Sequence, residues 1–257
     1  MTEPAPFQAD HAEALVSPSP NHGERKEART PDMILLHYTG METAEAALTW
    51  LRNPASEVSS HYFVHEDGRI EQLVPESRRA WHAGRSLWKG DADINSASIG
   101  IEIANSGHPG GLPAFPGAQI DAVIALCRDC AARWRIAPER VLGHSDVAPG
   151  RKVDPGEAFP WERLHAAGVG HLVPSQPVSG GRFLQRGDEG QPVEALQAML
   201  ALYGYGIEVT GEYCAFTEGV VAAFQRHFRR ERVDGIADAS TIATLHRLLS
   251  ALPAYAG

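Results

Sequence analysis

Short β-favouring runs alternate with helical segments over residues 33–134, and this alternation constrains the fold more than any other feature of the 257-residue sequence. The apolar run 33–38 is typical of a buried strand, and residues 43–51 follow it with the spacing of a helix. In the run 98–105 isoleucine occupies alternate positions, so a strand there would point Glu102 away from the apolar face. Strands that alternate with helices predict an α/β domain.

Two more local signals extend this prediction. An Asp-Gly pair stands between the β-favouring runs 61–65 and 69–74, which is a strong signal for an antiparallel hairpin. Apolar residues then recur at helical spacing over 120–134, before Pro138. We therefore expect a mixed central sheet flanked by helices.

The two ends of the chain differ from this middle part. Residues 1–30 have no periodicity and predict an extended amino-terminal arm before a main domain at 31–170. A Pro/Ser/Gly-rich stretch, 171–181, is the expected linker. Over 182–252 apolar residues fall at helical intervals in three segments separated by glycines, which predicts a second, small three-helix domain.

Composition removes several classes of partner. With 43% hydrophobic and 21% charged residues the chain is an ordinary globular protein, and its net charge of −9 argues against nucleic acid. No apolar run reaches the about 20 residues that a transmembrane helix needs. The first ten residues contain neither the basic nor the apolar region of a secretory signal. We also expect the protein to be a monomer.

The stretch 141–156 concentrates groups that can carry chemistry. It contains His144, Lys152 and Asp154, and its prolines and glycines indicate a rigid loop after a strand. Imidazole and carboxylate are good ligands for a divalent metal. A polar surface turn with a hydrogen-bonded histidine is the simpler interpretation, so support has to come from elsewhere in the chain.

His37, at the end of its predicted strand, supplies that support. Strand ends in an α/β sheet meet at one edge, so His37, His144 and Asp154 would converge there. Three protein ligands plus one open position for water is the arrangement of a catalytic zinc. Glu102 would act as the acid and base that moves the proton, and Lys152 would stabilise the oxyanion.

Six blocks of sequence carry a family resemblance. In order they are Ile-Leu-Leu-His37-Tyr-Thr, Ser-Ser-His-Tyr-Phe-Val64, Ala-Trp-His-Ala-Gly84, Ser-Ile-Gly-Ile-Glu-Ile-Ala-Asn105, Gly-His144-Ser-Asp and Arg-Lys-Val-Asp154-Pro-Gly156. Together they resemble the type 2 N-acetylmuramoyl-L-alanine amidases, the zinc amidase family of the anhydro-muropeptide and envelope amidases. The resemblance implies a type 2 amidase fold.

The resemblance also implies a site and a reaction. One zinc ion would be held by His37, His144, Asp154 and a water, with Glu102 and Lys152 as catalytic residues. The enzyme would hydrolyse the amide between N-acetylmuramic acid and L-alanine in peptidoglycan or muropeptides, in cell-wall turnover or recycling. Two alternatives stay open: a non-catalytic peptidoglycan recognition protein and a zinc peptidase that acts on the stem peptide.

The carboxyl-terminal segment resembles the peptidoglycan-binding type 1 module, through motifs such as Phe224-Gln225 and Val-Asp234-Gly235. Such a module would hold the catalytic domain near its polymer and raise the effective concentration without changing the chemistry. It favours the cell envelope or periplasm as the location, whereas the missing signal peptide favours the cytoplasm.

Five further residues are candidates for contact with the substrate, and each has a role in the scaffold as its alternative. They are His61, Tyr62, Trp81, His82 and Asn105.

Overall fold

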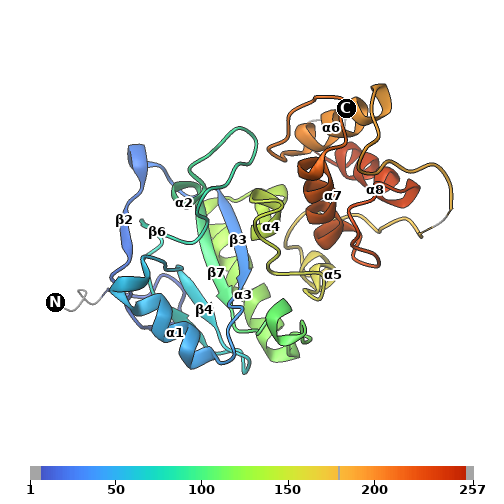
Figure 1. The fold of residues 1–257 in the computed structure, drawn as a ribbon. Coiled ribbons are helices and arrows are strands. Elements are labelled where there is room, and N and C mark those ends of the chain that lie inside the picture. The colour runs from blue at the N-terminus through green and yellow to red at the C-terminus, as the bar shows by residue number, and fades with distance from the viewer. Residues whose placement is uncertain (1–6, 179, 253–257) are drawn as a thin grey trace. The chain divides into compact units, whose positions relative to one another are not determined.

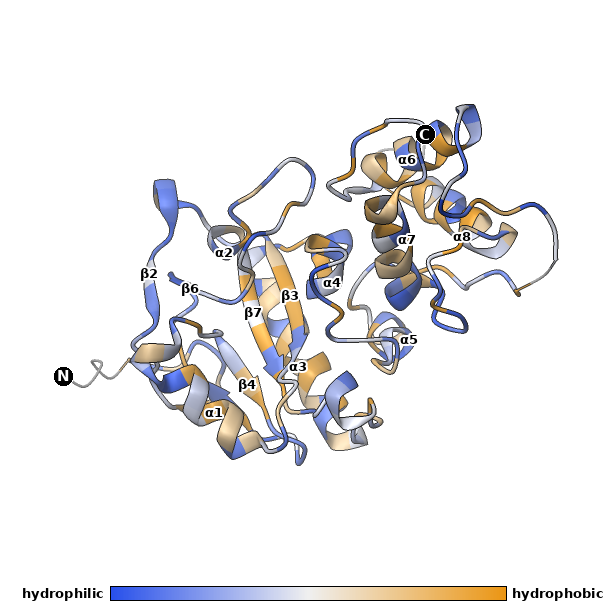
Figure 2. Ribbon diagram, viewed as in Figure 1, coloured by the Kyte–Doolittle hydropathy of each residue, from blue (hydrophilic) through white to orange (hydrophobic). Residues whose placement is uncertain are grey.

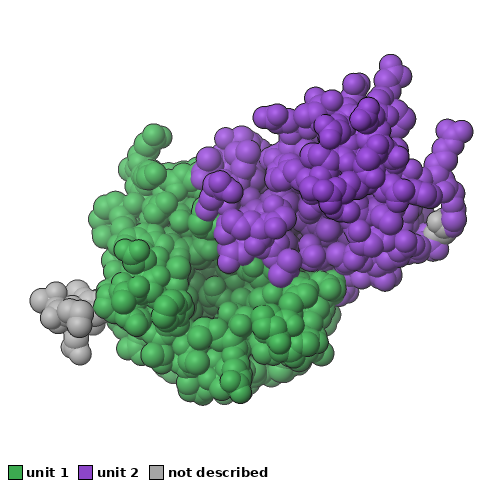
Figure 3. Space-filling view, viewed as in Figure 1, with its two compact units in different colours: residues 1–84, 93–143, 154–170 green, residues 85–92, 144–153, 171–257 purple. Residues whose placement is uncertain are grey.

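The computed structural model describes residues 7–178 and 180–252 of the chain (Figure 1). The described residues form two compact units (Figure 3). The first, which we call the sheet unit, comprises those of 1–84, 93–143 and 154–170, and the second, the helical unit, comprises those of 85–92, 144–153 and 171–257. Within the described part of the chain, no helix is long and apolar enough to cross a membrane.

A six-stranded mixed sheet lies at the centre of the sheet unit, in the order β1-β5-β4-β7-β3-β8. Its strands are β1 (Leu15–Val16), β3 (Met33–Tyr38), β4 (Tyr62–Val64), β5 (Ile70–Gln72), β7 (Ser98–Ile103) and β8 (Val141–Gly143). β3 runs parallel to its neighbours β7 and β8. All residues of β3 from Met33 to Leu36 are fully buried, and Figure 2 shows β3 and β7 as hydrophobic strands. The expected mixed sheet is confirmed.

The predicted hairpin is also present. β4 and β5 pair antiparallel around the Asp-Gly turn. Gly68 has a φ of +90°, and a Cβ there would come within 2.9 Å of the Ala118 carbonyl oxygen. The turn therefore needs glycine for its backbone conformation and for space.

Residues 1–6 of the predicted amino-terminal arm lie outside the described residues, and residues 7–30 pack within the sheet unit. β1 adds a parallel edge strand beside β5, and β2 (His22–Glu24) pairs with β6 (Arg78–Ala80) in a separate two-stranded sheet. The buried guanidinium of Arg25 donates hydrogen bonds to the carbonyls of Glu76, Ser96 and Ser98. Burial lowers the pKa of Arg25 to about 10, which leaves the side chain protonated at neutral pH. The arm is thus part of the packed structure.

Helices cover the sheet. They are α1 (Ala44–Arg52), α2 (Ile94–Ala97), α3 (Gly117–Trp134) and α5 (Trp161–Ala166), with short 3-10 turns at Lys26–Ala28, Pro54–Ser56, His108–Gly110 and Pro138–Arg140. The Thr43 hydroxyl caps α1 by accepting a hydrogen bond from the Ala46 N–H. Ala47 and Leu51 of α1 then pack in one cluster with Phe63 of β4. The helices predicted from residues 43–51 and 120–134 are both confirmed.

Three helices dominate the helical unit: α6 (Gln191–Tyr203), α7 (Ala215–Phe228) and α8 (Ala239–Ser250). The short helix α4 (His144–Val147) belongs to the same unit. Two buried glutamines make the same pair of hydrogen bonds. The side-chain oxygen of Gln197 accepts from the N–H groups of residues 210–211, and the side-chain oxygen of Gln225 accepts from the N–H groups of residues 234–235. Each glutamine holds the turn that follows its helix, and the predicted three-helix bundle is confirmed.

Part of the predicted linker is bound to these helices. The backbone N–H of Gln176 donates to the Thr244 hydroxyl, and its carbonyl accepts from Ser240. Arg247 donates to the carbonyl of Pro174. Residues 174–176 therefore follow α8 closely, because two hydroxyls and one guanidinium of that helix satisfy their backbone groups.

Candidate metal-binding and catalytic site

Three side chains with metal-ligand chemistry come together. One ligand atom each of His37, His144 and Asp154 lies within 4.8 Å of the others, and all three residues are buried. His37 lies near the end of β3 and His144 directly follows β8. Because β3 and β8 are parallel neighbours, their ends reach the same edge of the sheet. His37 and His144 thus meet as expected from the strand ends, and Asp154 joins them from the loop after α4 (His144–Val147).

The spacing of these donors fits a small divalent cation. Nδ1 of His37 lies 3.0 Å from Oδ2 of Asp154. Two ligands about 2.0–2.1 Å from one tetrahedral ion lie about 3.3 Å apart, close to this separation. Two imidazoles and one carboxylate leave one tetrahedral position for water or substrate. The group can therefore hold a catalytic metal.

The ring of His82 contacts the ring of His37. Nε2 of His37 lies 3.0 Å from Nδ1 of His82, and the two rings meet edge to face. The other nitrogen of His82 lies 3.3 Å from the Ser98 hydroxyl. A Cβ on Gly100 would come within 2.5 Å of the His82 ring, so only glycine leaves room for it. The sequence proposed a substrate contact for His82, and the structure adds a contact with the ligand His37 itself.

Glu102 lies beside His37. The two are register partners on the parallel strands β7 and β3, so their side chains share one face of the sheet. The isoleucines of β7 are fully buried on the other face, whereas Glu102 is partly exposed. The period-two pattern therefore predicted the direction of this carboxylate correctly.

Lys152 belongs to the stretch that joins His144 to Asp154. The stretch begins with the turn of α4, which the sequence did not predict, and the N–H of Lys152 then donates to the Ala148 carbonyl. Gly150 and Gly156 have φ values of +74° and +82°. These two left-handed positions explain the need for glycine in this loop. Lys152 itself is half-buried.

The other proposed substrate contacts divide into two groups. His61 and Tyr62 are fully buried: Nδ1 of His61 accepts from the Gly100 N–H, and the Tyr62 hydroxyl donates to Glu76. Burial, with the nearby Arg25, lowers the pKa of His61 to about 3. Both residues therefore serve the scaffold, because their polar atoms face protein groups.

The side chain of Asn105 also makes its hydrogen bonds within the protein. Its side chain accepts from the Gly107 N–H and donates to the Pro113 carbonyl, which is the strand-end cap that was its alternative role. Trp81 is half-exposed, and its backbone N–H donates to the Ser59 hydroxyl. Of the five candidates, Trp81 and His82 keep exposed surface that a ligand could reach.

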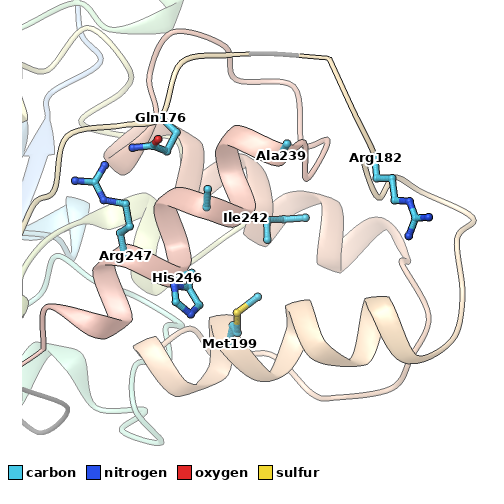
Figure 4. A pocket seen from close by; sticks show the side chains of 8 residues that line it. Gln176, Arg182, Met199, Ala239, Ile242, His246 and Arg247 are labelled. Atoms are coloured by element: carbon cyan, nitrogen blue, oxygen red, sulfur yellow. The ribbon is translucent and has the colours of Figure 1, made fainter. Parts of the chain in front are cut away.

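The helical unit has a candidate site of its own (Figure 4). A groove of about 670 Å³ is lined by apolar side chains of α6 and α8, with Met199 and Ile242 at its centre. Arg182, His246 and Arg247 stand at its rim. An apolar floor with a cationic rim suits a ligand that carries carboxylates.

Comparison with known proteins agrees with this geometry. Residues 27–157 match the N-acetylmuramoyl-L-alanine amidase family, and residues 189–245 match a putative peptidoglycan binding domain. The N-acetylmuramoyl-L-alanine amidase AmiD of Escherichia coli K12 is 38% identical over 230 residues, which cover 84% of this chain and 82% of that protein.

Two solved structures extend the similarity to the fold. One is E. coli AmiD in complex with the substrate anhydro-N-acetylmuramic acid-L-Ala-D-gamma-Glu-L-Lys, with 34% identity and a TM-score of 0.73 over 90% of this chain and 97% of that one. The other is AmpDh3 from Pseudomonas aeruginosa in complex with anhydromuramic pentapeptide, with 29% identity and a TM-score of 0.70 over 93% of this chain and 97% of that one. By sequence, fold and the grouping of His37, His144 and Asp154, the chain belongs to the N-acetylmuramoyl-L-alanine amidase family.

Proposed function

We propose that this protein hydrolyses the amide bond between the lactyl group of N-acetylmuramic acid and the L-alanine of the stem peptide, with one zinc ion. The observation that carries the proposal is the cluster of His37, His144 and Asp154 with Glu102 on the neighbouring strand. A zinc ion held by His37, His144 and Asp154 would supply Lewis acidity, which would polarise the scissile carbonyl and make water a nucleophile near neutral pH.

The chain's own residues move the protons. Glu102 accepts a proton from the attacking water as the new carbon–oxygen bond forms. The same carboxyl then delivers that proton to the alanine nitrogen as the carbon–nitrogen bond breaks, which leaves a free lactyl carboxylate and a free amine. The ammonium of Lys152 donates hydrogen bonds to the oxyanion that develops on the carbonyl oxygen.

The groove of the helical unit is proposed as the place where the polymer binds. Stem peptides carry several carboxylates, and the rim cations Arg182 and Arg247 complement them, with His246 as a further polar group. Arg182→Glu should weaken sedimentation with purified sacculi, whereas Arg186→Glu should not, because Arg186 is also solvent-exposed but lies outside the groove. Equal sedimentation of the two variants would exclude this groove.

One digestion experiment separates the proposed activity from its alternatives. Purified protein is incubated with anhydro-muropeptides, with and without a zinc chelator, and the products are weighed by mass spectrometry. An amidase releases the intact stem peptide from the sugar, and the chelator stops it. A peptidase would release shorter peptides, and a recognition protein would release nothing.

Two further properties belong to the proposal. We propose that the enzyme acts as a monomer, since all the residues of the site come from one chain. We also propose that it acts at the cell envelope, because a polymer-binding module is useful where the polymer is. Light scattering in solution tests the first statement, and fractionation of cells tests the second.

A further inference from the structure

A buried polar cluster lies in the helical unit, outside the residues assigned to catalysis. The carboxylate of Asp146 is fully buried, and the Tyr205 hydroxyl donates to its Oδ1 at 2.7 Å. Nδ1 of His227 donates to its Oδ2 at 2.7 Å. Burial, together with the Asp146 carboxylate, raises the pKa of Tyr205 well above its usual range, so the hydroxyl keeps its proton. Each oxygen of a buried charge thus has a donor from the carboxyl-terminal helical region.

Asp146 is important because of where it lies in the chain. It belongs to α4, the single helical turn that begins at the metal ligand His144. The turn is only four residues long and closes with a bond from the Ala148 N–H to the His144 carbonyl. A turn this short has little stability of its own, so its orientation depends on tertiary contacts. The hydrogen bonds that fix the position of Asp146 therefore also fix the backbone that carries His144.

A second segment joins the same arrangement. The N–H of Leu87 donates to the Val147 carbonyl at 2.8 Å, at the end of α4. The next residue, Trp88, is fully buried and packs edge to face on Tyr203 and Tyr205. A Cβ on Gly204 would come within 2.5 Å of the Trp88 ring. Residues 85–92 and 144–153, both from the amidase-matched range, thus pack in one unit with the carboxyl-terminal helices.

We propose that Tyr205 and His227 are positioning residues of the amidase site, which act through Asp146 to hold α4 and thereby the metal ligand His144. The carboxyl-terminal region then has a role besides binding polymer, because it completes the scaffold of the site. This inference rests on the proposed function for the identity of the metal, but its contacts are independent of the reaction.

The sequence contained one signal for this role. His227 and Phe228 lie three and four positions after Phe224 in α7, so the three side chains share one face of the helix, and all three are buried. A histidine on an apolar helix face needs a hydrogen-bond partner from another element. Its partner is 81 residues away in the chain, so the sequence could indicate the need but not the partner.

A matched pair of variants tests the inference. Tyr205→Phe removes the hydroxyl that binds Asp146. Tyr213→Phe is the control, because Tyr213 is equally buried in the helical unit but donates to the Gly235 carbonyl. Zinc affinity is measured by chelator competition, and kcat and KM are measured with an anhydro-muropeptide. The melting temperature is measured without zinc. We expect Tyr205→Phe to weaken zinc binding about tenfold and to lower kcat, since support of metal ligands is typically worth about 10- to 100-fold.

The control should lose a similar amount of thermal stability but keep the zinc affinity and kcat of the wild type. His227→Leu should behave like Tyr205→Phe, and His227→Asn, whose amide keeps a donor near the position of Nδ1, should restore most of the loss. Zinc affinities and kcat values that agree within twofold between Tyr205→Phe and Tyr213→Phe would overturn the inference. A wild-type protein that binds zinc but releases no stem peptide would instead overturn the proposed function, and the comparison of zinc affinities would still decide the inference.

Discussion

The imidazole nitrogen Nε2 of His37 lies 3.0 Å from Nδ1 of His82. Nδ1 of His37 faces Asp154, so the contact with His82 occupies the second ring nitrogen of His37. Metal-binding histidines commonly donate their second ring N–H to such a partner, which fixes both the tautomer and the orientation of the ring. His82 is therefore expected to contribute to metal binding without contacting the metal.

Removal of this support should weaken zinc binding. We expect His82→Ala to lower zinc affinity about tenfold, because His37 loses the partner that orients it. Gly100→Ala should lower it too, since the added methyl group would overlap the His82 ring. Chelator competition measures both. Gly117→Ala is the control, as a Cβ there meets no atom within 4 Å, and its zinc affinity should equal that of the wild type.

Glu102 can be separated from the metal ligands by one substitution. Glu102→Ala should keep zinc, because the three ligand atoms come from other residues. It should lose nearly all turnover, since the loss of a general acid and base typically costs about 100- to 10,000-fold. Zinc content by atomic absorption and kcat on a muropeptide are the two measurements. A fully active Glu102→Ala enzyme would refute the role assigned to this carboxylate.

Zinc should order the loop that carries two of its ligands. Residues 144–156 contain His144 and Asp154 and two glycines with positive φ, so an ion bound at both ends restricts the segment. Hydrogen exchange of these amides should slow when zinc is added. At a zinc concentration about 1,000 times the Kd the folded state should gain about 4 kcal/mol, visible as a higher melting temperature. Exchange rates unchanged by zinc would contradict the assignment.

Buried His61 should make stability depend on pH. Its pKa is lowered to about 3 in the folded protein, while the unfolded chain keeps a value near 6.5. Between these values the unfolded state binds the additional proton, so the free energy of unfolding rises with pH and falls on acidification from pH 6.5 towards 3. One proton corresponds to a slope of at most about 1.4 kcal/mol per pH unit.

His61→Gln tests this dependence. The variant should be less stable at neutral pH, because the Gly100 N–H loses its acceptor. Its free energy of unfolding should nevertheless change less steeply between pH 6.5 and 4, since one titrating group is gone. Urea denaturation at several pH values measures both effects, and parallel pH profiles of variant and wild type would contradict the neutral, buried histidine.

Much of the fold could be predicted because its signals are local. The alternating isoleucines of β7, the Asp-Gly turn of the hairpin and the helical spacing of α3 each depend on residues a few positions apart. The meeting of His37 and His144 followed from one general rule, that the ends of neighbouring parallel strands meet, whereas Asp154 reaches them from the loop after α4. These features depend on backbone periodicity and topology, which a sequence pattern expresses directly.

Side-chain partners could not be predicted in the same way. Nothing near His61 in the sequence shows that Gly100 and Arg78 would enclose it, and nothing near His227 shows that Asp146 is its acceptor. The turn of α4 and the inclusion of residues 85–92 and 144–153 in the helical unit likewise depend on long-range packing. The sequence by itself determined the family, the main strands and helices, and which side chains could bind a metal. Only the tertiary structure decided which polar groups are buried together, because burial and hydrogen-bond geometry arise between segments that are distant in the chain.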